Sequence, residues 1–116
     1  QRATQADPNS AMIFNNYGAF LFSQRRFEEG CKALARSTED PFYTRRAQAF
    51  ENLGRCYRLI DRDAAAEHVF NRSVTLSPQR VTAHIELADL YLDNGQASLA
   101  AQHYAIFQQQ LDAGKP

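Results

Sequence analysis

The sequence predicts an all-α fold, a solenoid of three helix–turn–helix repeats. Small residues recur at a nearly constant interval: Gly54 follows Gly18 by 36 positions, and Ala88 follows Gly54 by 34. Apolar residues around each of them recur at helical spacing, three or four positions apart. Each predicted pair of helices can bury its apolar face only by stacking on the next pair. The interval and the spacing together predict six helices, no strand and a right-handed superhelix.

The central repeat, about residues 44–78, shows the pattern most clearly. Its residues match the 34-residue tetratricopeptide (TPR) pattern in order and spacing: Phe50, Leu53, Gly54, Tyr57, Ala66, Phe70 and Pro78. Gly54 and Ala66 let the two helices approach closely, and the aromatic and leucine side chains fill the space between them. Pro78 ends the second helix, because proline cannot continue one.

The flanking repeats, about residues 11–43 and 79–113, carry the same positions with substitutions. The packing positions of the first are Phe14, Tyr17, Gly18, Leu21, Gly30 and Leu34, and those of the third are His84, Leu87, Ala88, Tyr91, Ala100 and Tyr104. Residues 1–10 are interpreted as the tail of a preceding repeat, since Asp7-Pro8 is a stop signal and Asn9-Ser10 a helix start. No dedicated capping helix is visible at either end, which favours a fragment of a longer solenoid.

Turn signals divide the repeats into helices. Arg25-Arg26 separates the first two, residues 39–43 connect the first repeat to the second, and Asn94-Gly95 makes the last turn. The expected helices span about residues 11–24, 27–38, 44–59, 62–76, 79–93 and 96–111.

Composition and motifs together limit the classes of function that the chain can have. The 116 residues contain 13 acidic and 13 basic side chains, so no net field draws the chain to nucleic acid. The sequence has no run of about 20 apolar residues, no visible signal peptide, and no GxGxxG, P-loop or GxSxG motif. The spacing of His68, His84 and His103 matches no zinc motif, and His84 stands where a packing aromatic is usual. We therefore expect no enzyme, cofactor, metal or small-molecule substrate.

Three segments go beyond a generic repeat: Asn15 to Leu21 (NNYGAFL), Pro41-Phe42-Tyr43, and Ala49 to Cys56 (AFENLGRC). In these the chain resembles the PilF/PilW family, TPR lipoproteins of type IV pilus biogenesis. The resemblance covers about residues 7–107. It implies a periplasmic pilotin at the outer membrane that helps the pilus secretin to reach the membrane, assemble or remain stable. It also implies membrane attachment only through an N-terminal lipid anchor, which this sequence lacks together with the family's leading repeats.

Two cysteines fall on consecutive predicted helices. If Thr38 and Ala49 face each other across the connector, seven residues in each direction bring Cys31 opposite Cys56, because seven residues make about two helical turns. An oxidising periplasm would permit a disulfide there. The alternative is two small buried side chains that only pack.

The first helix of each repeat is expected to line a concave groove for a protein partner. The expected lining residues are Asn15, Ala19, Phe22, Glu51, Arg55, Arg58, Ile85, Asp89 and Leu92. The alternative is that this face is merely exposed and binding occurs elsewhere.

The leading hypothesis is a non-enzymatic scaffold with the secretin as its partner. The alternative function is a generic TPR adaptor or co-chaperone that binds a C-terminal peptide in the groove. Asn15, Thr82 and Glu86 stand where that clamp would need basic residues.

Overall fold

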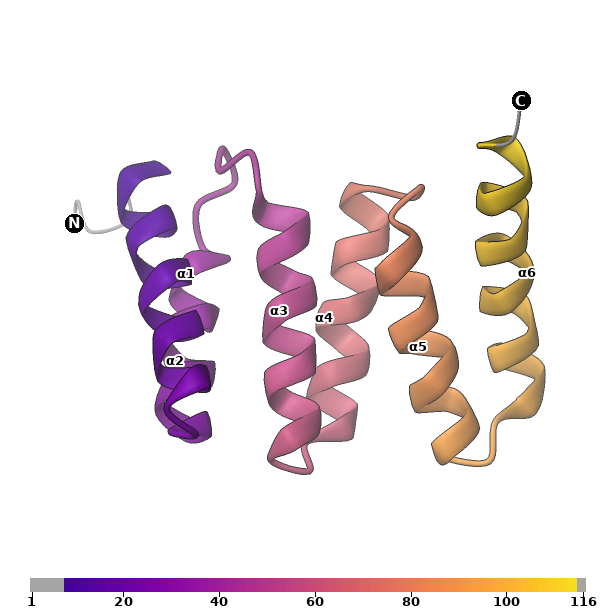
Figure 1. Ribbon diagram of the computed structural model, residues 1–116, viewed down its shortest axis with the longest axis horizontal. Helices are drawn as coiled ribbons and strands as arrows, with labels where there is room; N and C mark the ends of the chain where they lie inside the picture. Colours follow the sequence, from indigo (N-terminus) through magenta and orange to yellow (C-terminus); the bar gives the residue numbers. More distant parts are fainter. Residues whose placement is uncertain (1–7, 115–116) are drawn as a thin grey trace.

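The computed structural model describes residues 8–114, which form six α-helices joined by short turns (Figure 1). The helices are α1 (Pro8–Ser23), α2 (Phe27–Ser37), α3 (Arg46–Leu59), α4 (Asp63–Leu76), α5 (Val81–Asp93) and α6 (Ala97–Ala113). They stand side by side in chain order, with the two ends of the chain on opposite sides of the array. No strand occurs in this part of the chain, and the predicted all-α architecture of three helix pairs is confirmed.

The first helix begins earlier than predicted. Residues 8–10, which were assigned to the tail of a preceding repeat, form the first turn of α1, and residues 1–7 lie outside the described part. Proline suits the first turn of a helix because its φ is already helical and the N–H that it lacks has no partner there. The Asp-Pro signal therefore marks a helix start as well as a stop. The other helix ends lie within two residues of the predicted positions.

Each helix pair is joined by the same tight turn. Arg25, Asp61 and Gly95 occupy equivalent places and have φ values of 62°, 61° and 76°. The N–H of the following residue returns to a carbonyl in the last turn of the first helix in all three. Glycine adopts this left-handed conformation without strain, whereas an L side chain there costs about 1–2 kcal/mol. The positions of the turns were predicted, but the left-handed conformation could be expected from sequence only in the third turn, because only it has glycine at this place.

The small residues lie where paired helices cross, as predicted. A Cβ atom added at Gly18 would lie 2.7 Å from Cγ of Leu34, and one at Gly54 would lie 2.5 Å from Cε1 of Phe70. Ala88 is completely buried at the equivalent place between α5 and α6. The residue type at these three positions therefore sets how closely each pair can pack.

Two larger clusters make up most of the core, and a smaller one of Ala11, Tyr43 and Ala49 joins α1, the connector and α3. The first contains Cys31, Leu34, Phe50, Leu53, Cys56 and Val69. The second contains Ala66, Phe70, Leu87, Leu90, Tyr91 and Ala100. Since the first cluster joins α2 to α4 and the second joins α4 to α6, successive pairs share one apolar interior.

Two predicted packing residues do not fill this interior. Tyr17 is 51% exposed, although the equivalent residues Leu53 and Leu87 are buried. Leu53 and Leu87 belong to helices that follow another pair, whereas no helix precedes α1 in residues 8–114. Tyr104, equivalent to Phe70, is 37% exposed because no described helix follows α6. Phe14 is partly buried, with the guanidinium of Arg36 4.5 Å from its ring centre.

Candidate binding groove

Two adjoining hollows run along the first helices of the repeats. The first is lined by Ala19, Phe22, Leu34, Asn52 and Arg55. The second is lined by Phe22, Arg55, Arg58, Leu59 and Glu86. Because Phe22 and Arg55 belong to both, we treat the two hollows as one groove across α1, α3 and α5.

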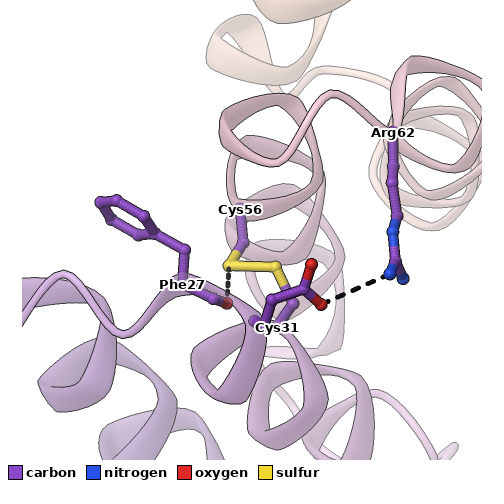
Figure 2. The surroundings of a disulfide bond; sticks show 5 residues. Phe27, Cys31, Cys56 and Arg62 are labelled. Atoms are coloured by element: carbon purple, nitrogen blue, oxygen red, sulfur yellow. Dashed lines mark hydrogen bonds and ion pairs between the residues drawn. A yellow bond between two sulfur atoms is a disulfide. The ribbon is translucent and has the colours of Figure 1, made fainter.

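The aromatic wall of the groove is supported by the disulfide. Phe22 packs edge-on against Phe27, with ring centres 5.3 Å apart and planes at 72°. The carbonyl oxygen of Phe27 lies 3.3 Å from Sγ of Cys56 (Figure 2). Cys31 and Cys56 are joined in a disulfide with their Cα atoms 5.6 Å apart. The two cysteines therefore do more than pack: they tie α2 to α3 directly beside this wall.

An ion pair lies next to the disulfide. Nη2 of Arg62, in the turn before α4, lies 3.3 Å from the Glu28 carboxylate on α2. Both side chains are more than half exposed, so the pair contributes at most about 1 kcal/mol. The disulfide therefore adds a covalent tie to the apolar contacts of Cys31 and Leu34 on α2 with Phe50 and Leu53 on α3.

The basic side chains of the groove are neutralised within the chain. Arg55 donates through Nε to Glu86, at 2.9 Å, and through Nη2 to Glu51, at 2.6 Å. Arg58 donates to the carboxylate of Asp93. The groove consequently presents no uncompensated charge from these two arginines, and its first hollow is mainly apolar with one amide, Asn52.

Glu51 was predicted to line the groove, and the structure contradicts this. Its side chain is only 2% exposed and lies between α3 and the start of α5. Its Oε1 accepts hydrogen bonds from Arg80 and Thr82, both at 2.7 Å, while Oε2 accepts from Arg55. A carboxylate with three donors is stable at this depth because the donors replace the lost water. Glu51 therefore fixes α5 against α3.

Asn15 occupies the same place one repeat earlier. Its side-chain oxygen accepts a hydrogen bond from Nδ2 of Asn52, at 3.3 Å, so it too links its helix to the next first helix. The position that Asn15 and Glu51 share in the repeat therefore makes a contact between repeats and does not line the groove.

The three predicted lining residues of α5 lie outside these two hollows. Ile85 is half-buried, Leu92 is exposed, and Asp89 accepts a hydrogen bond from the Tyr104 hydroxyl at 2.8 Å. The residue of α5 that does line the groove is Glu86. Sequence projection followed one stripe along each helix and missed the neighbouring residues Asn52, Leu59 and Glu86. Extending the stripe by one position would have found Asn52 and Glu86.

Two of the three histidines pair between α5 and α6: His84, which is buried, and His103, which is partly buried. Nδ1 of His84 lies 2.9 Å from Nδ1 of His103, and its Nε2 lies 2.9 Å from the Pro78 carbonyl oxygen. Burial, and then the nearby His84, lower the pKa of His103. Within residues 8–114 no three His, Cys, Asp or Glu side chains are grouped so that they could hold a metal ion. The two histidines therefore pack α5 against α6.

Comparison with known proteins places this arrangement among pilus proteins. No family model matches the sequence. The type IV pilus assembly protein PilF of Pseudomonas aeruginosa is 33% identical over 109 residues, which is 94% of this chain and 43% of PilF. A solved structure of P. aeruginosa PilF superposes with a TM-score of 0.80 at 34% identity, over 86% of this chain and 45% of that one. The chain is a homologue of PilF and PilW. The crystal structure of PilW, described as a widely conserved type IV pilus biogenesis factor, gives a TM-score of 0.81 at 31% identity, over 91% of this chain and 49% of PilW.

The predicted relationship to these pilus biogenesis proteins is thus confirmed. The chain spans less than half the length of PilF. The first TPR domain of Spaghetti (RPAP3), bound to an HSP90 peptide, superposes with a TM-score of 0.83 at 17% identity, over 90% of this chain and 82% of that one. At that identity the likeness shows the TPR fold alone. None of the described helices combines the length and the apolar character needed to cross a membrane.

Proposed function

We propose that this chain is a non-enzymatic, protein-binding part of a type IV pilus biogenesis factor, and that its groove holds a segment of the outer-membrane secretin. The observation that carries the proposal is the identity of 33% to PilF over 94% of the chain, on a fold whose first helices line a continuous groove. Arg55 and Arg58, the two arginines of the groove, are already paired with carboxylates. We therefore assign to the groove the binding and orientation of a partner segment and not a reaction. Assistance to secretin localisation, assembly or stability is the function that we infer.

The first hollow supports binding of an apolar side chain from the partner. Ala19 and Phe22 form one wall from α1, and Asn52 and Arg55 form the other from α3. An apolar residue placed between them would cover the Phe22 ring, while the Asn52 amide could bond the backbone of an extended segment.

Capture from envelope fractions tests this proposal. The full-length protein should retain the secretin after mild detergent extraction, and the Ala19→Arg variant should reduce recovery at least about tenfold by filling the first hollow. A matched control is Ala101→Arg, which adds the same side chain to an exposed position on α6, far from the groove in sequence and fold. Undiminished recovery with Ala19→Arg, or equal loss with Ala101→Arg, would refute groove binding.

The second candidate is a TPR adaptor that clamps an acidic C-terminal peptide, as the RPAP3 domain holds an HSP90 peptide. Its support is the presence of Arg55 and Arg58 along the groove. Both would first have to leave their carboxylate partners, Glu86 and Asp93. Recovery of chaperone tails in place of the secretin in the same capture experiment would favour this candidate.

We further propose the periplasm as the location and a lipid anchor at the N-terminus of the full-length protein as the outer-membrane attachment. The support is the relationship to PilF and PilW, which are pilus biogenesis proteins and therefore act at the cell envelope. Fractionation of cells that make the full-length protein, with and without substitution of an acylated cysteine, tests both parts. Release of the substituted form into the soluble periplasm is the expected result.

We also propose that α1 packs against the second helix of a preceding repeat. Three apolar side chains of α1 are more than half exposed: Ile13, Tyr17 and Phe20. The residues at the same places in α3 are buried: Ala49, Leu53 and Cys56. Since α3 packs on α2 through its equivalent face, α1 has the surface needed to receive a helix of the same kind.

Stability measurements test this packing. Tyr17→Lys should destabilise the full-length protein by about 2 kcal/mol more than it destabilises this 116-residue chain, since the ring is buried only in the longer protein. Ala101→Lys, on the exposed face of α6, is the control. Equal effects of Tyr17→Lys in both chains would refute the packing.

A further inference from the structure

A hollow outside the groove lies where the second repeat meets its two neighbours. It is formed by the connector before α3, the first turn of α3 and the turn between α4 and α5. Its lining residues are Pro41, Tyr43, Thr44, Arg45, Arg46, Ala47, Gln48, Leu76, Ser77 and Arg80. Three arginines and no acidic residue line it, in a chain whose total charges balance.

The positive charge around this hollow is crowded. The guanidinium carbon of Arg46 lies 5.1 Å from the centre of the Phe50 ring, and that of Arg72 lies 4.8 Å from the same ring. Burial, and then the charge of Arg72, lower the pKa of Arg46, although the charge of Asp40 acts to raise it. The Nε of Arg46 donates to the Thr38 carbonyl oxygen at 2.7 Å, which leaves its terminal nitrogens for a ligand. Two cations held against one buried ring repel each other, and a bound anion would relieve that repulsion.

The nearby carboxylates are buried. Asp40 is 7% exposed, and its Oδ1 accepts a hydrogen bond from the backbone N–H of Phe42 at 2.9 Å, whereas its buried Oδ2 has no hydrogen-bond partner among the described residues. Glu51 accepts from Arg80 and from two other donors. Arg45 is exposed and forms no ion pair with any described residue, so its full charge is available to a ligand.

Uncharged donors complete the lining. Thr44 and Ser77, which carry hydroxyl groups, also line the hollow, and no side chain caps the start of α3. The first-turn backbone N–H groups of Ala47 and Gln48 therefore remain available, as is usual in an uncapped helix. Guanidinium, hydroxyl and backbone N–H groups are the donors that oxyanions select.

We propose that this hollow binds an oxyanion, the carboxylate of an acidic protein segment, at Arg45, Arg46 and Ser77. The assignment of the anion to a protein rests on the proposed scaffold function; the anion site itself does not. A segment that occupied both sites would have an apolar residue for the groove and an acidic residue for this hollow. Phosphate shares the chemistry of a carboxylate and serves as the probe for the site.

Titration with inorganic phosphate at low ionic strength, followed by the amide resonances of the 116-residue chain, tests the site. Saturable shifts should centre on Ala47 and Gln48, and Arg45→Gln should weaken the apparent affinity at least about fivefold. Lys32→Gln, which removes one exposed positive charge from α2, is the matched control and should change the affinity less than about twofold. Shifts spread over all basic residues, or equal weakening in both variants, would overturn the site.

Two ligands then distinguish the source of the anion. A short Asp- and Glu-rich peptide should compete with phosphate and lose affinity in the Arg45→Gln variant. Vesicles that contain an anionic phospholipid should bind no better than neutral vesicles. Binding to anionic vesicles that depends on Arg45, without binding to the acidic peptide, would overturn the assignment to a protein partner while leaving the groove proposal to its own capture experiment.

Discussion

Replacing Gly54 with alanine should destabilise the protein, although alanine is the better helix former. The added Cβ would lie 2.5, 2.6 and 2.7 Å from three atoms of the Phe70 ring, which is completely buried. Overpacking of this kind costs about 1–3 kcal/mol, and contacts this short against a ring without free space belong to the upper end. Alanine returns about 0.5–1 kcal/mol through helix propensity. The expected net loss is therefore about 2 kcal/mol.

Urea unfolding at neutral pH, with the disulfide intact, measures this loss as a lower midpoint at unchanged slope. The double variant Gly54→Ala/Phe70→Leu provides the decisive comparison, because leucine lacks the ring atoms Cε1 and Cζ of Phe70 that would lie 2.5 and 2.6 Å from the new Cβ. The two changes together should cost at least about 1 kcal/mol less than the sum of their separate effects. A neutral or stabilising Gly54→Ala, or strictly additive effects, would refute close packing at this crossing.

Three further predictions concern the buried carboxylate, the histidine pair and the disulfide. Glu51→Ala should lower the free energy of unfolding by about 2 kcal/mol, since it removes the charged acceptor of three hydrogen bonds; urea unfolding measures it. Acidification from pH 7.5 to 5 should lower the thermal unfolding midpoint. Because the pKa of His103 is lowered in the folded protein by burial and by His84, the unfolded chain binds the proton more readily, so the stabilisation is full above about pH 6.5 and is lost as the pH falls through the folded-state pKa. Reduction of the Cys31–Cys56 bond, whose cysteines are 25 positions apart, should cost about 3 kcal/mol through the added freedom of the unfolded chain, measured by urea unfolding with and without reductant.

Each of these predictions has a control within the chain. Glu86→Ala removes a partner of Arg55 that is 25% exposed and accepts from one donor, so it should cost less than Glu51→Ala, about 1 kcal/mol. His68→Gln should keep the acid sensitivity, because His68 is exposed, whereas His103→Gln should diminish it. The variant with both cysteines replaced by alanine should not respond to reductant. An unchanged midpoint at pH 5, or equal stability of the reduced and oxidised protein, would contradict the corresponding argument.

The sequence was sufficient to predict the helix pairs and their crossings because these depend on contacts within one repeat. Gly54 opposes Phe70 and Gly18 opposes Leu34 as the TPR spacing implies. Burial at the ends of the array could not be predicted in this way. Tyr17 matches the pattern as well as Leu53 does, but its exposure depends on whether another helix pair lies beside it.

The groove was predicted in outline and not in detail. Of the residues projected onto the first helices, Ala19, Phe22 and Arg55 line the first hollow, together with Leu34 of the partner helix α2. It could not show that Glu51 turns towards Arg80, because that contact joins residues 29 positions apart in different repeats. The superhelical offset between repeats decides which face is free, and no single-helix pattern contains that offset.

The order of contacts in this fold has a consequence for its opening motions. Each helix has its extensive contacts with its immediate neighbours in sequence, and the covalent cross-link joins only the first and second hairpins. The C-terminal hairpin can therefore detach by itself, at the cost of one apolar seam and of the polar contacts across it, such as the ion pairs Arg55–Glu86 and Arg58–Asp93. The rate of amide hydrogen exchange should vary along the chain, fastest in α6 and slowest around α3. The cross-linked half would then stay folded while the C-terminal hairpin opens locally.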